Sequence, residues 1–173
     1  TLITSSAASD VYKRQLTNSG SEQNIILLSA GSEESIERSE IALGTHEIVN
    51  ANLQGIAQIM NQSAISPEVH YNGMVHTLQG QGAQALLRGV QHQALWVHPK
   101  VRIIEGRFPQ SGEIMIGRLA HHKLGLKPID LEVGEFLNFN SEKLKIVGIF
   151  DARGTVMDCL LYTSDAADDV ISV

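Results

Sequence analysis

Apolar residues recur at helical spacing in one stretch of the chain. Four of them follow one another at intervals of four, three and four residues, which places them on one face of a helix. They are Val49, Leu53, Ile56 and Met60. Thr45 is a suitable N-cap for this helix, and Glu47 is favourable in its first turn. We therefore expect a helix whose apolar stripe packs on a sheet.

Short apolar runs between turn residues predict strands in the rest of the chain. The run 24–30, closed by Gly31, is apolar enough for a strand that is buried on both faces. The stretches at 80–82 and 140–142 have the composition of hairpin turns. Further strands are expected at 68–71, 74–78, 83–90, 101–105, 114–116, 135–139 and 144–150.

A second, shorter helix is expected at 118–124. Gly125 should end it in the left-handed conformation, and Pro128 prevents its continuation. We expect Leu119 and Leu124 to point inward, whereas the residues at 121–123, His-His-Lys, point outward. Strands around two helices, without regular β–α alternation, indicate an α+β fold.

The composition narrows the classes of function. A chain of 173 residues with 43% hydrophobic residues fits one domain, or two small subdomains that share a core. Its formal net charge of −6 argues against a mainly electrostatic grip on nucleic acid or anionic lipid, because both need clustered Lys and Arg. The apolar runs fall far short of the about 20 residues that span a bilayer, and no signal peptide opens the chain.

The two ends of the chain are related through their coding DNA. Residues 5–15 and 159–168 can be encoded by the two strands of one duplex, read one base out of frame. That duplex resembles the transposase adapter used to tag DNA fragments for sequencing. We therefore interpret 1–15 and 159–173 as adapter-derived tails around a genuine domain at 16–158, and we expect both tails to be peripheral or disordered.

Histidines and carboxylates are the first candidates for chemistry. His121 and His122 are adjacent on a helix and point about 100° apart, so they cannot chelate one metal ion in the usual manner. The pairs His70/His76 and His92/His98 are expected on strand faces or in solvent. The run from Glu33 to Glu40 holds four carboxylates, which fits paired-carboxylate catalysis but more simply a solvated loop.

Other catalytic patterns lack their residues. Cys159, the only cysteine, falls in the C-terminal tail, which leaves the 16–158 segment without thiol chemistry or Cys-ligated metal. The glycines at 80 and 82 are not followed by the third glycine of a dinucleotide fingerprint, and no phosphate-loop or nucleophile-elbow motif is present. We predict no catalytic, cofactor-binding or metal-binding residues, and no cofactor.

Several short motifs, taken in order, carry a family resemblance. In the first half they are NIILLS at 24–29, GSEESIERSE at 31–40, RGV at 88–90 and VHPKV at 97–101. In the second half they are IEGRFP at 104–109, GEIMIGRLA at 112–120, LG at 124–125 and IVGIF at 146–150. This order resembles the extracytoplasmic part of ABC transporter permeases of the MacB/FtsX/LolC-E type.

The resemblance implies an architecture and a setting. It implies a MacB-like periplasmic core domain, in which a porter-like α+β subdomain carries a small β-rich subdomain. Because the chain stops where the family returns to the first subdomain, we expect that subdomain to be incomplete and to leave an exposed edge. The resemblance also implies a full-length protein in the cytoplasmic (inner) membrane, with this domain on its periplasmic side.

The same resemblance implies a role and partners. We expect a non-enzymatic module that transmits ATP-driven motion to a periplasmic adaptor or substrate during export. Its partners would be an ATP-binding subunit or domain, a periplasmic adaptor and a second copy in a homodimer, with no nucleic acid. The alternative is a small soluble hydrolase or other enzyme that uses the acidic loop Glu33 to Glu40. An enzyme would gather two or more of these carboxylates in a concave pocket, whereas the transport module leaves them in solvent.

Overall fold

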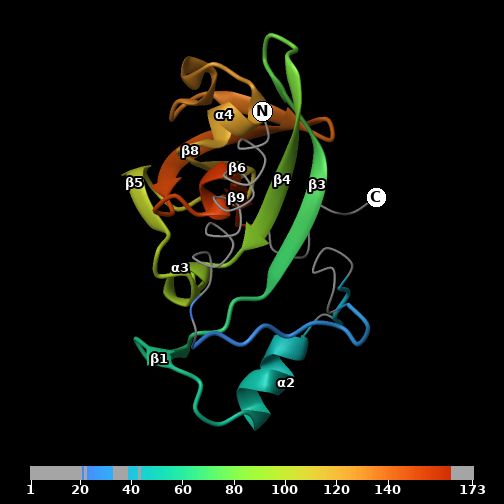
Figure 1. Ribbon diagram of the computed structural model, residues 1–173, viewed down its shortest axis with the longest axis vertical. Helices are drawn as coiled ribbons and strands as arrows, with labels where there is room; N and C mark the ends of the chain where they lie inside the picture. The colour runs from blue at the N-terminus through green and yellow to red at the C-terminus, as the bar shows by residue number, and fades with distance from the viewer. Residues whose placement is uncertain (1–20, 22, 33–38, 43, 165–173) are drawn as a thin grey trace, which may run out of the picture.

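The computed structural model describes residues 21, 23–32, 39–42 and 44–164, and it shows an α+β fold in which a small lobe adjoins a larger β-structure (Figure 1). The lobe consists of helix α2 and the β1–β2 hairpin. The elements are α2 (Thr45–Asn52), β1 (Gln58–Ile59), β2 (Gln62–Ser63), β3 (Glu68–Thr77), β4 (Gly82–Val90), α3 (Ala94–Val97), β5 (Arg102–Gly106), β6 (Glu113–Gly117), α4 (Ala120–Leu124), the 3-10 helix η2 (Pro128–Leu131), β7 (Phe136–Phe139), β8 (Glu142–Asp151), the 3-10 helix η3 (Val156–Cys159) and β9 (Leu161–Thr163).

The large sheet closes on itself into a barrel. Its strand order is β5-β8-β6-β9-β4-β3-β7, and β7 also pairs with β8, so the ring runs from β8 through β6, β9, β4, β3 and β7 back to β8. The pairs β6–β8 and β4–β9 are parallel, and the other pairs in the ring are antiparallel. Strand β5 adds to the outside of the ring by pairing with β8. Closure gives every ring strand a partner on both sides over part of its length.

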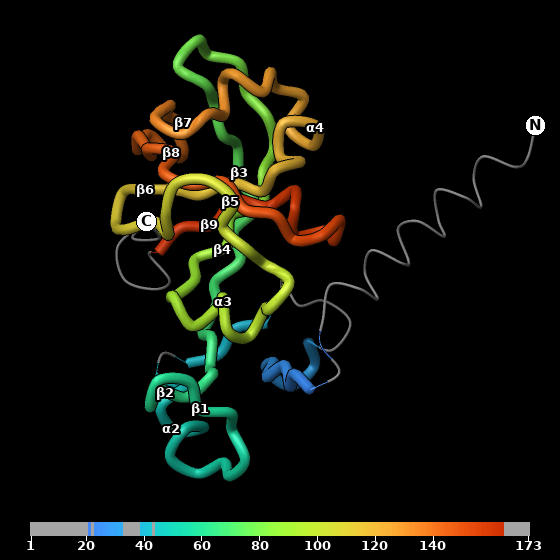
Figure 2. Tube along the Cα trace, turned by 90° about the vertical axis from the view of Figure 1, so that its left-hand side faces the viewer, coloured from blue at the N-terminus to red at the C-terminus, as the bar shows by residue number. Residues whose placement is uncertain are grey.

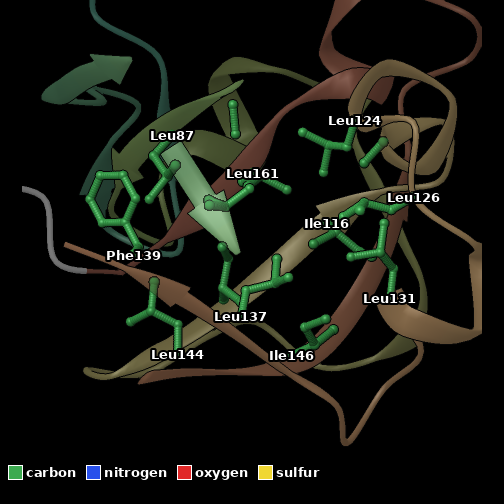
Figure 3. Packing of buried hydrophobic residues seen from close by; sticks show 14 residues of the cluster. Leu87, Ile116, Leu124, Leu126, Leu131, Leu137, Phe139, Leu144, Ile146 and Leu161 are labelled. Atoms are coloured by element: carbon green, nitrogen blue, oxygen red, sulfur yellow. The ribbon is translucent and has the colours of Figure 1, made fainter. Parts of the chain in front are cut away.

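Alternating side chains fill the barrel interior. In β3, Val75 and Thr77 are buried whereas Met74 and His76 are exposed, which is the period of two expected for a strand with one face inward. All the ring strands contribute to one apolar cluster (Figure 3). Its strand residues are Val75, Ala85, Leu87, Ile114, Ile116, Leu137, Phe139, Leu144, Ile146 and Leu161.

A second apolar cluster covers the opposite face of four ring strands, with Val90 contributed by β4. Met115, Phe150 and Tyr162, from β6, β8 and β9, are each fully buried in it. Ala94 of α3 and Met157 of η3 belong to the same cluster. The strands that contribute to both clusters are therefore covered on both faces, which explains their continuous apolar sequence.

Two-residue turns join two of the hairpins. Asn140 and Ser141 have φ angles of 47° and 70°, and Met60 and Asn61 have φ angles of 51° and 62°. Positive φ at both central residues is the geometry of type I′ turns, whose twist matches that of paired strands. The hairpin expected at 140–142 is thereby confirmed, and the one expected at 80–82 joins β3 to β4. The strands expected at 68–71 and 74–78 form one continuous strand, β3.

The expected apolar helix stripe at 49–60 is wrong in its extent and its packing. Helix α2 ends at Asn52, and none of its residues is buried. Leu53 already has extended backbone, and Leu53 and Met60 are 52% and 89% exposed. Gly55 follows with φ 86°, a conformation that does not continue a helix. The glycine that the apolar spacing passes over is therefore the physical reason for the early end.

The strand expected at 24–30 is also wrong. No residue of this run is in a strand, and Ile25, Ile26 and Leu27 are 85%, 68% and 52% exposed. An apolar run becomes a buried strand only where a neighbouring strand pairs with it. Among the described residues, the barrel strands pair with one another and leave this run without a strand partner.

The expectation that the C-terminal tail is peripheral is wrong for residues 159–163. Leu161 and Tyr162 are fully buried, and β9 lies between β6 and β4 in the middle of the sheet. Leu-Tyr-Thr suits a central strand because its residues are apolar, aromatic and β-branched. Residues 1–15 and 165–173 lie outside the described residues, and the adapter origin of both tails stays a prediction.

The short helix near Gly125 follows its expectation closely. Helix α4 ends at Gly125, whose φ of 64° provides the left-handed cap. Leu124 is buried and Leu119 half-buried, whereas His122 and Lys123 are exposed and His121 is half-buried. The helix packs against η3 and beside β4, as a strut on the barrel should.

Candidate functional site: a buried polar network at the start of β3

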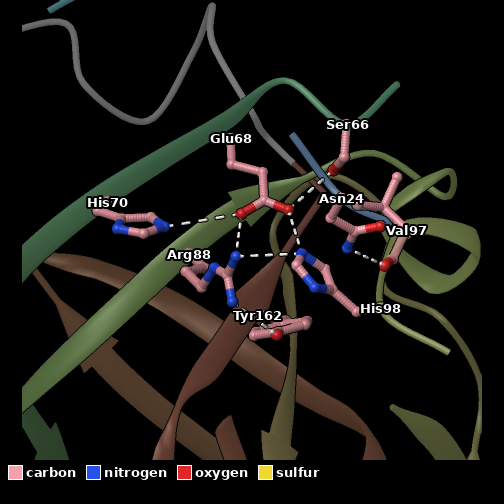
Figure 4. A network of polar contacts seen from close by, with 8 residues as sticks. All are labelled: Asn24, Ser66, Glu68, His70, Arg88, Val97, His98 and Tyr162. Carbon is pink, nitrogen blue, oxygen red and sulfur yellow. Dashed lines mark hydrogen bonds and ion pairs between the residues drawn. The ribbon is translucent and has the colours of Figure 1, made fainter. Parts of the chain in front are cut away.

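Glu68 lies where the chain passes from the lobe into the barrel (Figure 4). Its Oε2 pairs with Nη2 of Arg88 from β4, and its Oε1 lies 2.8 Å from Nε2 of His98, which follows α3. Ser66 donates a hydrogen bond to the same Oε1 at 2.9 Å. Nε2 of His70 lies 3.7 Å from Oε2. One carboxylate thus connects the segment leading into β3, strand β4 and the end of α3.

The three charged or ionisable side chains in closest contact are largely buried, which strengthens the electrostatic interactions between them. The side chains of Glu68, Arg88 and His98 are only 12%, 8% and 15% exposed. Burial alone would raise the pKa of Glu68, but the imidazoles of His70 and His98 and the charge of Arg88 outweigh it and hold this pKa well below its usual range. Glu68 is therefore a carboxylate at neutral pH, and removing one partner would leave an unpaired buried charge.

Arg88 extends the network to the central strand β9. Its Nη1 donates a hydrogen bond to the hydroxyl of Tyr162 at 3.1 Å, and its guanidinium carbon lies 5.4 Å from the centre of the Tyr162 ring. Burial raises the pKa of Tyr162 to about 12, so the phenol stays protonated at neutral pH. Arg88 therefore bridges Glu68 at the edge of the lobe to the barrel wall.

The contacts of this network suit the positioning of structural elements better than acid–base catalysis. Both oxygens of Glu68 are engaged, and a carboxylate with a depressed pKa is a weak general base. Asn24 adds a further tie from the N-terminal segment, since its Nδ2 donates to the carbonyl of Val97 at 2.7 Å. Polar contacts of this kind fix the relative position of the elements they join.

A second buried carboxylate organises the connection from β8 to β9. Asp158 is completely buried and accepts hydrogen bonds from the amides of Ala152 and Gly154 at 2.5 and 2.6 Å. Its own carbonyl accepts the amide of Leu119, and a Cβ added at Gly117 would lie 2.1 Å from that carbonyl oxygen. The turn into β9 is thereby held against β6 and α4, where only glycine fits at position 117.

The residues singled out in the sequence fall into three groups. His70 and His98, placed in different pairs by the sequence, meet at Glu68, whereas His121 and His122 stack on each other with ring centres 3.9 Å apart. No group of three His, Cys, Asp or Glu residues suited to a metal ion occurs within the described part of the chain. Most of the loop Glu33 to Glu40 lies outside the described residues, so both the predicted solvated loop and its enzymatic alternative stay predictions.

Sequence reasoning missed the Glu68–Arg88 pair, although a signal was present. Arg88 stands in the run 83–90, which is otherwise almost entirely apolar or small. A charged residue inside such a strand is rarely buried unless it is paired. That rule predicts a buried partner for Arg88, but it does not identify Glu68, which lies 20 residues earlier in sequence.

The fold and the network together define a class: an α+β domain in which a small lobe adjoins a closed β-barrel whose wall contains a buried polar network. No protein-family model and no curated protein matches the chain. In structure it is similar to the periplasmic region of MacB from Actinobacillus actinomycetemcomitans, with a TM-score of 0.55 and 14% identity. The match covers 83% of this chain and 73% of that one. The chain therefore has the fold of a MacB-like periplasmic domain.

Two further solved structures match with lower scores. One is the extracellular domain of the noncanonic ABC-type transporter YknZ from Gram-positive bacteria, with a TM-score of 0.46, 13% identity, and coverage of 67% of this chain and 59% of that one. The other is a domain of a permease protein from Porphyromonas gingivalis, with a TM-score of 0.49, 10% identity, and coverage of 71% and 56%. No helix in the described part of the chain is long and apolar enough to cross a membrane.

Proposed function

We propose that this chain is the extracytoplasmic domain of an ABC transporter permease, and that it transmits ATP-driven motion to a periplasmic adaptor or substrate during export. The observation that carries the proposal is the fold that the chain shares with the periplasmic region of MacB. The motif order from NIILLS to IVGIF supports it independently, because that resemblance comes from sequence alone. In this proposal, an ATP-binding subunit and a second copy of the permease act through membrane helices outside this domain.

The geometry of the polar network supports a mechanical role. A domain that passes displacement from one end to the other needs elements that do not slip relative to one another. Glu68, Arg88 and Tyr162 connect the lobe side of β3 to the central strand β9 through buried, charge-assisted contacts. A displacement that reaches the start of β3 would therefore be passed through these side chains to β4 and β9.

The test uses the natural gene from which this domain comes, expressed with its ATP-binding subunit and reconstituted in liposomes. The part of that gene corresponding to residues 44–158 is replaced by a flexible Gly/Ser linker in one variant. We expect ATP hydrolysis to continue in this variant while export stops. Continued export without the domain would overturn the proposal, as would a natural gene that encodes no membrane helices beside it.

The enzyme alternative has its own test. The chain is assayed against ester, amide and glycoside substrates, together with a Glu33→Gln/Glu34→Gln variant. Hydrolysis that the wild-type chain performs and the variant lacks would favour the acidic-loop enzyme over the transport module.

A further inference from the structure

A groove separates the lobe from the lower end of the barrel and is the feature that the proposed function leaves unused. Its volume is about 470 Å³, within the range of about 300–1,000 Å³ typical of small-molecule sites. One wall comes from α2 and the β1–β2 hairpin, and the other from the connection between β4 and α3. Figure 2 shows α2, β1 and β2 together at the end of the molecule below α3.

Side-chain carboxamides dominate the lining. Five of the residues that line the groove carry one: Asn50, Asn61, Gln62, Gln91 and Gln93. The lobe wall is internally braced, because Gln58 donates to the hydroxyl of Ser63 at 2.7 Å and that hydroxyl donates to Oδ1 of Asn50. The wall thus keeps its shape without a ligand, which lowers the entropic cost of binding one.

The lining chemistry excludes most ligand classes. An anion such as a phosphate would meet the Glu47 carboxylate here, and no Arg or Lys is present among the described residues that line the groove. A strongly apolar ligand would leave the carboxamides without hydrogen bonds. Glu47 and His46 add a carboxylate and an imidazole, which between them accept hydrogen bonds from hydroxyls or donate to them. What remains is an uncharged ligand rich in groups that both donate and accept.

Two uncharged ligands meet that description, an extended peptide backbone and a saccharide. A peptide is normally held along an exposed strand edge with a regular repeat of main-chain groups. Each strand of the β1–β2 hairpin has only two residues, too few for that repeat. Saccharide hydroxyls lie in several directions and match donor–acceptor groups that come from several elements. We propose that this groove binds a neutral saccharide, through the carboxamides of Asn50, Gln62, Gln91 and Gln93.

The test is a titration of the ¹⁵N-labelled chain, followed through its backbone and side-chain NH₂ signals by NMR. The probes are the neutral disaccharides maltose, cellobiose and N,N′-diacetylchitobiose, with tetra-alanine as the peptide. We expect saturable shifts of the groove carboxamides with at least one disaccharide, at a Kd of about 1 mM because no large aromatic ring lines the site. The double variant Gln91→Ala/Gln93→Ala should weaken binding about tenfold, since it removes two hydrogen-bonding groups.

Gln84→Ala is the matched control, because Gln84 is an exposed carboxamide on β4 outside the groove. It should leave the affinity unchanged, and unaltered barrel methyl signals should show that each variant is folded. Saturation with tetra-alanine alone would overturn the proposal in favour of a peptide site. Absence of saturation with every disaccharide would also overturn it, as would equal weakening by Gln84→Ala. The binding assay is independent of export, so its failure would not touch the proposed transport role.

Discussion

Arg88 matters both for the stability of the fold and for its proposed mechanical role. It places a full charge in the barrel wall, where it contacts Glu68 and Tyr162. The desolvation cost of the two charges offsets much of their attraction, so the pair contributes position more than net stability. Removing one of the two partners should therefore lower the stability, whereas removing both should cost much less.

Arg88→Met should lower the free energy of unfolding by about 3–5 kcal/mol, because it removes the guanidinium that pairs with the buried Glu68 carboxylate. Glu68→Leu combined with Arg88→Met should recover most of that loss. Urea unfolding of the wild type, both single variants and the double variant measures the cycle. Additive losses in the double variant would show that the two side chains act independently.

The depressed pKa of Glu68 predicts how stability depends on pH. A carboxyl whose pKa is lower in the folded state stabilises the fold above its unfolded pKa of about 4.3, and this contribution is lost as the pH falls below that value. The free energy of unfolding should therefore drop between about pH 5 and pH 3, and less steeply in Glu68→Gln. Glu113, whose pKa Arg107 also lowers, will retain part of the slope. Identical slopes in the two proteins would contradict the assignment.

The sequence patterns did not predict strand β9, although this strand lies in the middle of the sheet. It pairs with β4 on one side and β6 on the other, and it supplies Leu161 and Tyr162 to the two faces of the sheet. Interpreting residues 159–173 as a tail leads to the expectation that deleting them is harmless, whereas closure of the barrel leads to the opposite expectation.

A chain that ends at Asp158 should fail to fold, because opening the ring exposes two apolar clusters in a domain whose total stability is about 5–15 kcal/mol. A chain that ends at Ser164 should melt like the full chain. Circular dichroism melting of both truncations decides between them. Equal melting temperatures would show that β9 does not close the barrel.

Helix α4 is a strut whose two faces should respond differently to substitution. Leu124→Ala should cost about 2–5 kcal/mol because Leu124 is 6% exposed within the barrel cluster. His121→Ala combined with His122→Ala should change stability by no more than about 0.5 kcal/mol. Chemical denaturation of these variants measures both effects. A large loss from the histidine pair would mean that their stacked rings are structural.

Across the whole molecule, local patterns predicted most barrel strands and both turns, since strand period and turn composition are properties of neighbouring residues. They did not predict which strands pair, and that information decides burial. The run 24–30 is apolar but lacks a strand partner, and β9 is short but has two. The same limit applies to the site. The charge of Arg88 indicates that it has a buried partner, but only the pairing of β3 with β4 identifies that partner as Glu68.

The exposed run Ile25 to Leu27 should make the chain self-associate, because it presents apolar side chains on backbone outside any strand. Ile26→Lys should reduce association, measured as the concentration dependence of the sedimentation coefficient. Gln84→Lys adds the same charge at an exposed position on β4 and should leave association nearly unchanged. Equal effects of the two substitutions would trace the association to net charge.

The central claim is that the domain moves as a unit when the transporter uses ATP. In the full-length permease, each native cysteine is replaced by Ser, and Lys145, an exposed residue of β8, is replaced by Cys to carry a spin label. Pulsed electron paramagnetic resonance then measures the distance between the labels of the two copies. The account predicts that this distance distribution shifts between the ATP-bound and ADP-bound states. An unchanged distribution in a transporter that hydrolyses ATP and exports substrate would contradict it.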